Sequence, residues 1–394
     1  MNQAVSKSCL YMRIMRSTPS MINVSEFHVA ITNEVRHMKQ IVFSFLLMIL
    51  AGNSFYSLAQ SAGNNQPVRG IMLSTPDTKQ VDVFVKFIEK ELAPRKVNHL
   101  ILKVNYHLEY LSRPEIREKK TLSNKGAKKI LYVCRKNNIE LVPLVNCLGH
   151  QSWGADEKNI RAILKAYPEL EENPEAQIND KDFYCRSYCP LHPKLHGVLF
   201  DILKETIDVF EATDLHVGMD EVFVLGEDGC THCKGLDKAK LFAGEVNKLH
   251  GFLSSHNVKM WMWGDRYLDG EVTGLGKWQA ATNGTHPAID LVSRDIVICD
   301  WHYKIAPHTA TYFAIKGFPV ISCSYHMPSV AIQQLNEMNT LHKESSEEIA
   351  SRMKGLMHTF WGNTSEFMNA FEGKAVSKKT QEAYKTFLSI SEKW

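Results

Sequence analysis

Two adjacent acids, Asp220 and Glu221, are the residues of this sequence best placed to do chemistry. They follow residues 214–217, which read as the end of a β-strand, and hydrophobic residues flank them, with Val217 before and Val222 after. A carboxylate at an apolar wall must be paired, hydrogen-bonded or shifted in pKa, and such a shift is what general acid–base catalysis uses. The alternative interpretation is a structural ion pair.

Strand-like and helix-like segments alternate from residue 68 onward. Apolar, β-branched runs are typical of strands covered on both faces, and amphipathic stretches separate them. We expect strands at residues 68–74, 99–106, 139–148, 215–218, 259–263, 295–299, 319–324 and 355–360. We expect helices at residues 77–91, 125–138, 159–167, 196–211, 238–257, 309–316, 329–339 and 378–392. The alternation predicts an α/β fold with a parallel sheet, and eight units predict a closed (β/α)8 TIM barrel.

One connection between strands lacks the expected helix. Residues 269–294 carry Gly270, Gly274, Gly276 and Gly284 and lack helical periodicity, so a loop is expected in place of the fifth helix. An open, doubly wound sheet is the alternative architecture. It is disfavoured because no glycine-rich phosphate loop follows the first strand.

Polar and aromatic residues gather near the strands, and a barrel of this kind does its chemistry where the strands end. The candidates, in chain order, are Arg69, His150, Trp261, Trp263, Asp300, Trp301, Tyr303, Tyr325, Trp361 and Asn363. Aromatic faces beside hydrogen-bonding groups suit a sugar, which has apolar C–H faces and a hydroxylated rim. Strand alternation predicts that Trp261 and Trp263 face the same way and Met262 the other.

Four segments together resemble glycoside hydrolase family 20, the exo-β-N-acetylhexosaminidases. Residues 216–221, His-Val-Gly-Met-Asp-Glu, are similar to that family's His-x-Gly-Gly-Asp-Glu motif. Residues 69–73, 143–150 and 360–363 are similar, in order, to its opening strand, its motif ending in Gly-His, and its final Trp-x-Glu. The sequence differs at Met219, Leu144, Asn146 and Asn363, where the family has Gly, Glu, Asp and Glu.

The resemblance implies removal of a terminal β-linked N-acetylhexosamine, GlcNAc or GalNAc, from a glycan by substrate-assisted, retaining catalysis, without a cofactor. Glu221 would be general acid and base, and Asp220 would orient the 2-acetamido group, with Tyr303 or Tyr325 as its second contact. His150 would support Glu221. The ring hydroxyls would be bound by Arg69 and Asp300, the outer hydroxyls by Asn363, and the sugar face by Trp261, Trp263, Trp301 and Trp361.

Two alternatives remain open. One is a barrel glycosidase that uses a separate carboxylate nucleophile, Asp265 or Asp300. The other is a glycan-binding barrel without catalysis, which the differences at Met219, Asn146 and Asn363 favour.

Composition bears on partners and on the cysteines. The chain of 394 residues is 44% hydrophobic and 23% charged, and its net charge of +3 arises within the first 60 residues. The remainder is neutral and has no basic block with interleaved aromatic residues, so nucleic acid is not an expected partner. Two close cysteine pairs, Cys185 with Cys189 and Cys230 with Cys233, could be disulfides, free thiols or zinc ligands, and the second pair has the better zinc spacing.

The first 60 residues are predicted to lie outside the barrel. Met38 and Lys39 precede an apolar run over residues 41–50, and small residues follow near Ala59, as in an export signal. We therefore interpret residues 1–37 as an upstream over-read, 38–60 as a signal peptide and 61–394 as a single catalytic barrel, exported to the periplasm or secreted. The apolar run is too short for a stable membrane anchor, although a retained anchor is the alternative.

Expression in a Gram-negative host tests this assignment. Removal of the signal peptide should give a periplasmic protein whose first residue lies close to Ser61, as read by amino-terminal sequencing. An intact amino terminus on a membrane-bound protein would support the retained anchor instead.

Overall fold

Eight parallel strands close into a barrel in the computed structural model, which describes residues 66–152, 160–175 and 184–394. The predicted over-read and signal peptide lie outside these residues. The strands are β1 (Val68–Ser74), β2 (His99–Lys103), β3 (Glu140–Cys147), β4 (Asp214–Gly218), β5 (Lys259–Trp263), β6 (Val297–Trp301), β7 (Val320–Ser324) and β8 (Met353–Thr359). Each pairs with its neighbours in sequence, and β8 pairs with β1, which confirms the predicted TIM barrel.

Strand alternation divides the core into two layers. Side chains inside the barrel include Met72, Ile101, Trp261 and Trp263, whereas Met262 belongs to the larger core between strands and helices. The predicted opposite facing of Met262 is therefore confirmed. Strand β6 begins at residue 297, two residues later than expected, so Trp301 is its last residue.

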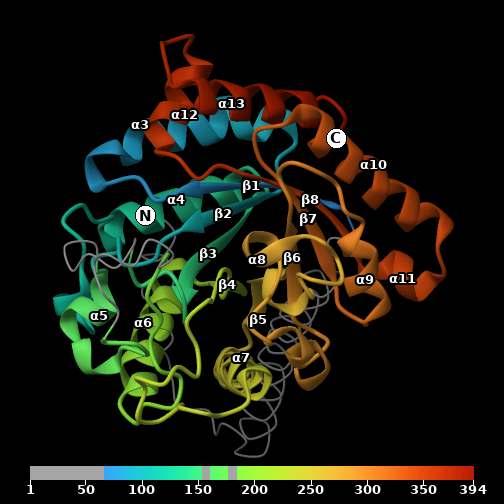
Figure 1. The fold of residues 1–394 in the computed structure, drawn as a ribbon. Coiled ribbons are helices and arrows are strands. Elements are labelled where there is room, and N and C mark those ends of the chain that lie inside the picture. The colour runs from blue at the N-terminus through green and yellow to red at the C-terminus, as the bar shows by residue number, and fades with distance from the viewer. Residues whose placement is uncertain (1–65, 153–159, 176–183) are drawn as a thin grey trace, which may run out of the picture. The chain divides into compact units, whose positions relative to one another are not determined.

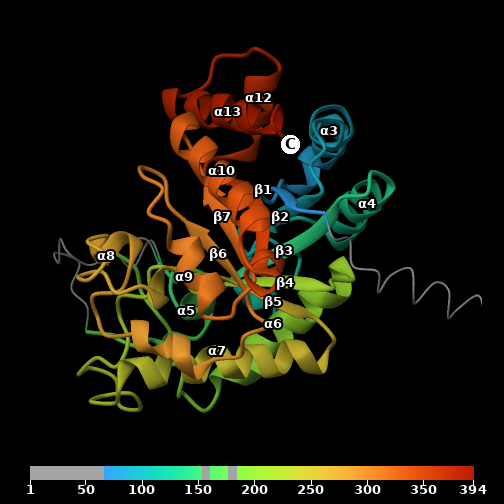
Figure 2. The same ribbon diagram turned by 90° about the vertical axis from the view of Figure 1, so that its right-hand side faces the viewer.

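Helices surround the strands, as Figures 1 and 2 show. They are α3 (Val81–Phe87), α4 (Asn124–Lys136), α5 (Ala162–Ala166), α6 (Leu195–Phe210), α7 (Lys238–Ser255), α8 (Gly276–Gln279), α9 (Thr309–Ile315), α10 (Pro328–Glu344), α11 (Glu347–Arg352), α12 (Thr364–Phe371) and α13 (Lys378–Ser391). Side-chain caps fix several starts: Ser123 accepts from Gly126 N–H before α4, and Asp237 accepts from Lys240 N–H before α7. No helix of the described residues combines the length and apolarity needed to cross a membrane.

The connection from β5 to β6 lacks a long helix, as predicted. It holds only the four-residue α8 and 3-10 turns at Asp265–Tyr267 and His286–Leu291. This loop can therefore reach over the carboxyl ends of the strands, and it brings Trp278 to the site described below.

The last helices cover the seam where β8 meets β1. Phe367 and Phe371 of α12 pack edge-on against Phe87 of α3, with ring centroids 6.3 and 5.1 Å apart. In Figure 1 the red α12 and α13 lie beside the blue α3. Helices that follow β1 and β8 thus pack against each other.

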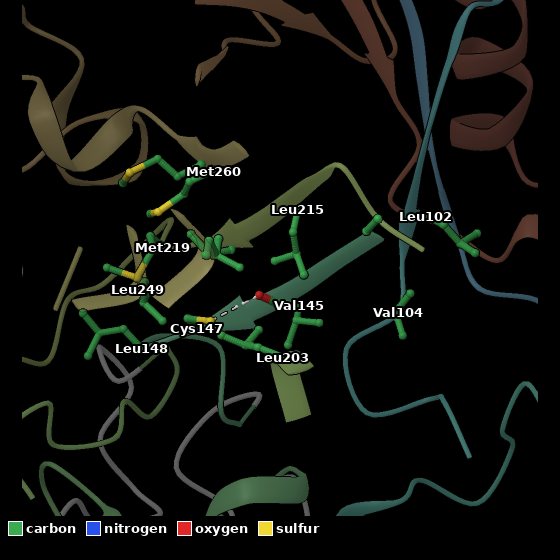
Figure 3. Packing of buried hydrophobic residues seen from close by; sticks show 14 of the residues in the cluster. Leu102, Val104, Val145, Cys147, Leu148, Leu203, Leu215, Met219, Leu249 and Met260 are labelled. Carbon is green, nitrogen blue, oxygen red and sulfur yellow. Dashed lines mark hydrogen bonds between the residues drawn. The ribbon is translucent and has the colours of Figure 1, made fainter. Parts of the chain in front are cut away.

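Met219 lies at the turn after β4 and joins this turn to the core. Its side chain is 1% exposed and points between strands and helices, where Figure 3 shows it among Leu148, Leu249 and Met260. Its backbone φ is +74°, a left-handed conformation that disfavours any side chain by about 1–2 kcal/mol. Burial of the thioether chain offsets this strain.

Substitution of Met219 should separate the stabilisation due to side-chain burial from the cost of the backbone strain. Met219→Ala loses the buried side chain, about 2–5 kcal/mol, and keeps the strain, whereas Met219→Gly loses the side chain but relieves the strain. The free energy of unfolding in urea should therefore follow the order wild type, Gly, Ala. The reverse order of Gly and Ala, usual elsewhere in a protein, would contradict the left-handed backbone.

Candidate active site

The turn after β4 presents the two acids at the carboxyl end of the barrel. Gly218 has φ +71° and Glu221 has φ +49°, so the chain reverses sharply between them. Gly218 is required because a Cβ there would lie 2.5 Å from Asn146 Oδ1. The turn leaves the Asp220 side chain buried and that of Glu221 14% exposed.

His150, from the loop after β3, contacts both acids. Its Nε2 lies 3.2 Å from Asp220 Oδ2 and 3.5 Å from Glu221 Oε2. Burial lowers the pKa of His150, but the two carboxylates outweigh burial and raise it. His150 Nε2 therefore lies within reach of both acids, whereas the sequence predicted that it supports Glu221.

The two carboxyl groups have opposite pKa shifts. The pKa of Glu221 is raised to about 7, first because burial disfavours its charge and second because Asp220 carries a negative charge beside it. Burial also acts to raise the pKa of Asp220, but His150 and a backbone N–H outweigh burial and lower it. One acid thus keeps a proton near neutral pH while its neighbour is ionised.

Asp265 holds the backbone of the turn. Its Oδ2 accepts from Glu221 N–H at 2.9 Å and from Arg266 Nε at 2.7 Å, and Trp301 Nε1 lies 3.4 Å from its Oδ1. Asp265 is 2% exposed and does not line the cavity. It is a positioning residue for Glu221.

A cavity of about 490 Å³ opens beside the acids. Its walls are mainly aromatic and basic and come from the loops after β3 to β8. The residues that line it are His150, Tyr184, Asp220, Glu221, Leu275, Trp278, Gln279, Trp301, Tyr303, Lys304, Tyr325, His326, Trp361 and Lys379. The structure thus brings together seven predicted residues: the two acids, His150, Trp301, Tyr303, Tyr325 and Trp361.

Tyr303 is fixed within this wall. Its hydroxyl oxygen accepts from Trp361 Nε1 at 2.8 Å. Thr359 Oγ1 lies 3.2 Å from the same oxygen and donates its own proton to Ser324 O at 2.8 Å, so Tyr303 can donate its proton to Thr359 Oγ1. Trp263 packs 5.7 Å from Trp361 and is fully buried, so it supports the cavity without lining it.

Three predicted sugar contacts lie elsewhere. Arg69 and Trp261 belong to the amino-terminal end of the barrel, where Arg69 Nε donates to Lys96 O and Trp261 Nε1 donates to Asp214 Oδ1. Asp300 faces outward from β6, because its neighbour Trp301 faces inward, and it bonds to Thr309 and His302. None of these three residues lines the cavity beside the acids, so the structure does not bring them together with the other predicted sugar contacts.

Asn363 lines a second, polar cavity of about 370 Å³ that shares His150 with the first. Asn363 Oδ1 caps α12 by accepting from Ser365 N–H at 2.8 Å, so its side chain is held at the helix start. Lys103 also lines this cavity, with Nζ 5.1 Å from the Trp361 ring, and burial lowers its pKa to about 8.

The sequence did not indicate two aromatic residues of the wall. Tyr184 hydrogen-bonds to Glu221, and its ring lies 5.9 Å from His150 and 5.0 Å from Trp278. Trp278 is 46% exposed, which is unusual for so large an apolar side chain. The sequence did offer one signal for Trp278. The glycine-rich segment 269–294 has no hydrophobic core of its own, so a tryptophan in it is expected to pack against another part of the protein.

Two groups of side chains in the described part of the chain have spacing suited to a metal ion. One is His150, Asp220 and Glu221, whose side chains already contact one another. The other is Glu172 with Cys189, Cys230 and Cys233. It contains the predicted pair Cys230 and Cys233, whereas Cys185 lies apart from it with Sγ 3.8 Å from Glu221 O.

The barrel and its acid pair define a (β/α)8 protein with a polar, aromatic site at the carboxyl ends of the strands. The family model described as glycosyl hydrolase family 20, catalytic domain, matches residues 90–379, and the chain belongs to this family. This confirms the resemblance found in the sequence. A search of curated proteins finds no match.

Solved structures of similar fold include a Flavobacterium johnsoniae chitobiase, at 18% identity and a TM-score of 0.57 over 82% of this chain and 51% of that one. A Bacteroides fragilis β-N-acetylhexosaminidase is 16% identical, with a TM-score of 0.57 over 83% of this chain and 66% of that one. A Vibrio harveyi exo-β-N-acetylglucosaminidase, solved with N-acetylglucosamine, is 16% identical, with a TM-score of 0.53 over 83% and 58%. The chain thus spans half to two thirds of the length of these proteins.

The raised pKa of Glu221 predicts a pH-dependent stability. Its folded pKa of about 7 exceeds the ordinary value of 4.5, so the folded state binds more protons and loses stability as pH rises between these values. Glu221→Gln carries no charge, so its free energy of unfolding relative to wild type should increase from about pH 5 to pH 8 in urea titrations. The control Asp228→Asn, an exposed acid whose side chain is 93% accessible, should show no such trend. A pH-independent difference for Glu221→Gln would contradict the assignment.

Proposed function

We propose that this protein is an exo-acting β-N-acetylhexosaminidase that uses its substrate's own acetamido group as nucleophile. The proposal rests on one observation above all: adjacent carboxyl groups, one holding a proton and one ionised, face an aromatic cavity. Membership of glycosyl hydrolase family 20 supports the same reading, as does the naming of the similar proteins for β-N-acetylhexosamine hydrolysis.

Glu221 acts first as an acid. Its proton passes to the glycosidic oxygen as the bond to the anomeric carbon breaks, and the resulting carboxylate then takes a proton from the attacking water. The Tyr184 hydroxyl and His150 Nε2 hold this carboxyl at the cavity edge. A pKa of about 7 suits both steps, because the group must release and recover a proton near neutral pH.

Asp220 acts through its charge. It accepts the acetamide N–H, aligns the amide oxygen with the anomeric carbon and stabilises the positive charge of the oxazolinium ion. The Tyr303 hydroxyl, held by Trp361 Nε1, lines the cavity and is suited to turn its proton from Thr359 Oγ1 to the amide oxygen. Trp301 and Trp361 offer flat apolar faces to the acetamide methyl group and the sugar ring.

The contacts of the other acids disfavour a separate enzyme nucleophile. Asp265 is engaged by Arg266 and the Glu221 backbone, and Asp300 by Thr309 and His302. Neither side chain lines the cavity. The attacking oxygen is therefore assigned to the substrate.

A substrate panel tests the reaction. Aryl β-N-acetylglucosaminide or β-N-acetylgalactosaminide should be hydrolysed, and the matching aryl β-glucoside, which lacks the acetamide, should not. A thiazoline analogue of the cyclic intermediate should inhibit competitively. Hydrolysis of the glucoside at a similar rate would indicate an enzyme nucleophile, and glycan binding without turnover would indicate a lectin-like barrel.

Glu221→Gln tests the acid. It should lower kcat/KM about 10²–10⁴-fold on a substrate with a poor leaving group and much less on a nitrophenyl glycoside, whose departure needs little protonation. The fall of wild-type kcat/KM above about pH 7, where Glu221 loses its proton, should disappear in the variant. Asp228→Asn, on the same loop, should match wild type. An equal loss on both substrates would remove Glu221 from the acid role.

A further inference from the structure

Three thiols and a carboxylate converge behind the loops that carry the active site. Cys189 Sγ lies 3.0 Å from Cys233 Sγ and 3.3 Å from Cys230 Sγ, and Glu172 completes the group. The four ligand atoms lie within 4.8 Å of one another, and all four residues are at most 4% exposed. The residues come from two distant loops, which follow β3 and β4.

Glu172 is the unusual member. Its Oε1 accepts from the backbone N–H of Gly226 at 2.6 Å and of Glu227 at 3.2 Å. Its Oε2 is buried and accepts no hydrogen bond from any residue that the structure describes. A buried, fully enclosed carboxylate oxygen is costly unless it meets a positive charge or a donor, so this atom points to a missing ligand.

The backbone around the cysteines folds into tight turns. The N–H of Lys234 donates to Cys230 O, and the N–H of His192 donates to Cys189 O, so Cys230 and Cys189 each begin a turn. Gly235, with φ +70°, ends the Cys-x-x-Cys turn in a left-handed conformation.

We propose that Glu172, Cys189, Cys230 and Cys233 bind one zinc ion in a closed, tetrahedral, structural site. Zinc takes three thiolates and a carboxylate oxygen at about 2.0–2.3 Å, and these bonds place neighbouring sulfurs roughly 3.8 Å apart. Small rotations of the cysteine side chains open the sulfurs by less than about 1 Å to this spacing. Soft thiolates select zinc over magnesium and calcium.

A disulfide is the competing chemistry for the same sulfurs. An S–S bond of about 2.05 Å would join only two of the three cysteines. It would leave the third thiol and Glu172 Oε2 without a function, whereas a metal ion uses all four side chains. The composition of the group therefore favours the metal.

The site would brace the catalytic loops. The loop after β3 carries Tyr184 and Cys185, which both touch Glu221, and the loop after β4 carries Glu221 itself. A metal shared between Cys189 on one loop and Cys230 and Cys233 on the other fixes their spacing. Zinc here would position the acid without touching the substrate.

Metal analysis of the untagged, full-length protein tests the proposal. Purified under reducing conditions without added metal, it should contain about one zinc per chain by inductively coupled plasma mass spectrometry. Cys189→Ala or Cys230→Ala should lower the zinc content at least 10-fold. Cys134→Ala, which removes a buried thiol of α4 outside this group, should retain it. Glu172→Gln should weaken zinc binding in a chelator competition.

Cobalt substitution covers the case in which a variant fails to fold. Wild-type protein loaded with Co²⁺ should show the intense ligand-field bands of a tetrahedral site and thiolate charge transfer, and a mercurial should release the metal. Protein free of zinc and without this cobalt spectrum would overturn the proposal. A Cys189–Cys233 or Cys189–Cys230 linkage found by peptide mapping of the protein would also overturn it, in favour of a disulfide.

Discussion

The contact of one imidazole with two carboxylates is the interaction on which the site depends. Asp220 and Glu221 are adjacent in sequence and both face inward, so two full negative charges would repel each other strongly in a buried place. His150 lies within 3.5 Å of both, and two pKa shifts reduce this repulsion: that of His150 favours the charged imidazole, and that of Glu221 favours the neutral carboxyl group. The different protonation of two neighbouring acids is therefore a property of the cluster, not of either residue.

The backbone is shaped to keep this cluster in place. The turn after β4 holds Gly218, Met219 and Glu221 at positive φ, and Asp265 receives the Glu221 N–H. Such a turn is stable only because Met219 is packed beneath it and the Asp265–Arg266 pair is buried behind it. Strain in the turn is thus offset by contacts that come from other strands of the barrel.

Much of this arrangement could be predicted from the sequence. The periodicity of hydrophobic residues locates the strands and helices, and their regular alternation predicts a barrel. The eight strands were located, although β2 ends three residues earlier than predicted, β6 begins two residues later and β8 two residues earlier. The acid pair, His150, Trp301 and Trp361 follow from strand ends. Arg69 and Trp261 lie away from the cavity because they stand toward the amino-terminal ends of their strands, and Asp300 faces outward, as alternation with Trp301 already required.

The remaining parts of the site depend on loops, whose sequences show no hydrophobic periodicity from which a structure could be predicted. Tyr184 and Trp278 come from connections of irregular conformation and meet only in three dimensions. The cysteines show the same limit: the short spacing between Cys185 and Cys189 pointed to a pair, yet Cys189 joins Cys230 and Cys233. Proximity in sequence therefore did not predict which cysteines lie together, because loops that follow two different strands meet here.

The opposite opening of the barrel has its own polar arrangement, in which Trp261 bonds to Asp214 and packs 5.8 Å from His99. Changes there lie away from the cavity beside the acids, so they should alter how long the folded protein survives and not what that cavity accepts. Durability and selectivity are in this way assigned to different ends of the same eight strands, and protein engineering can adjust one without sacrificing the other.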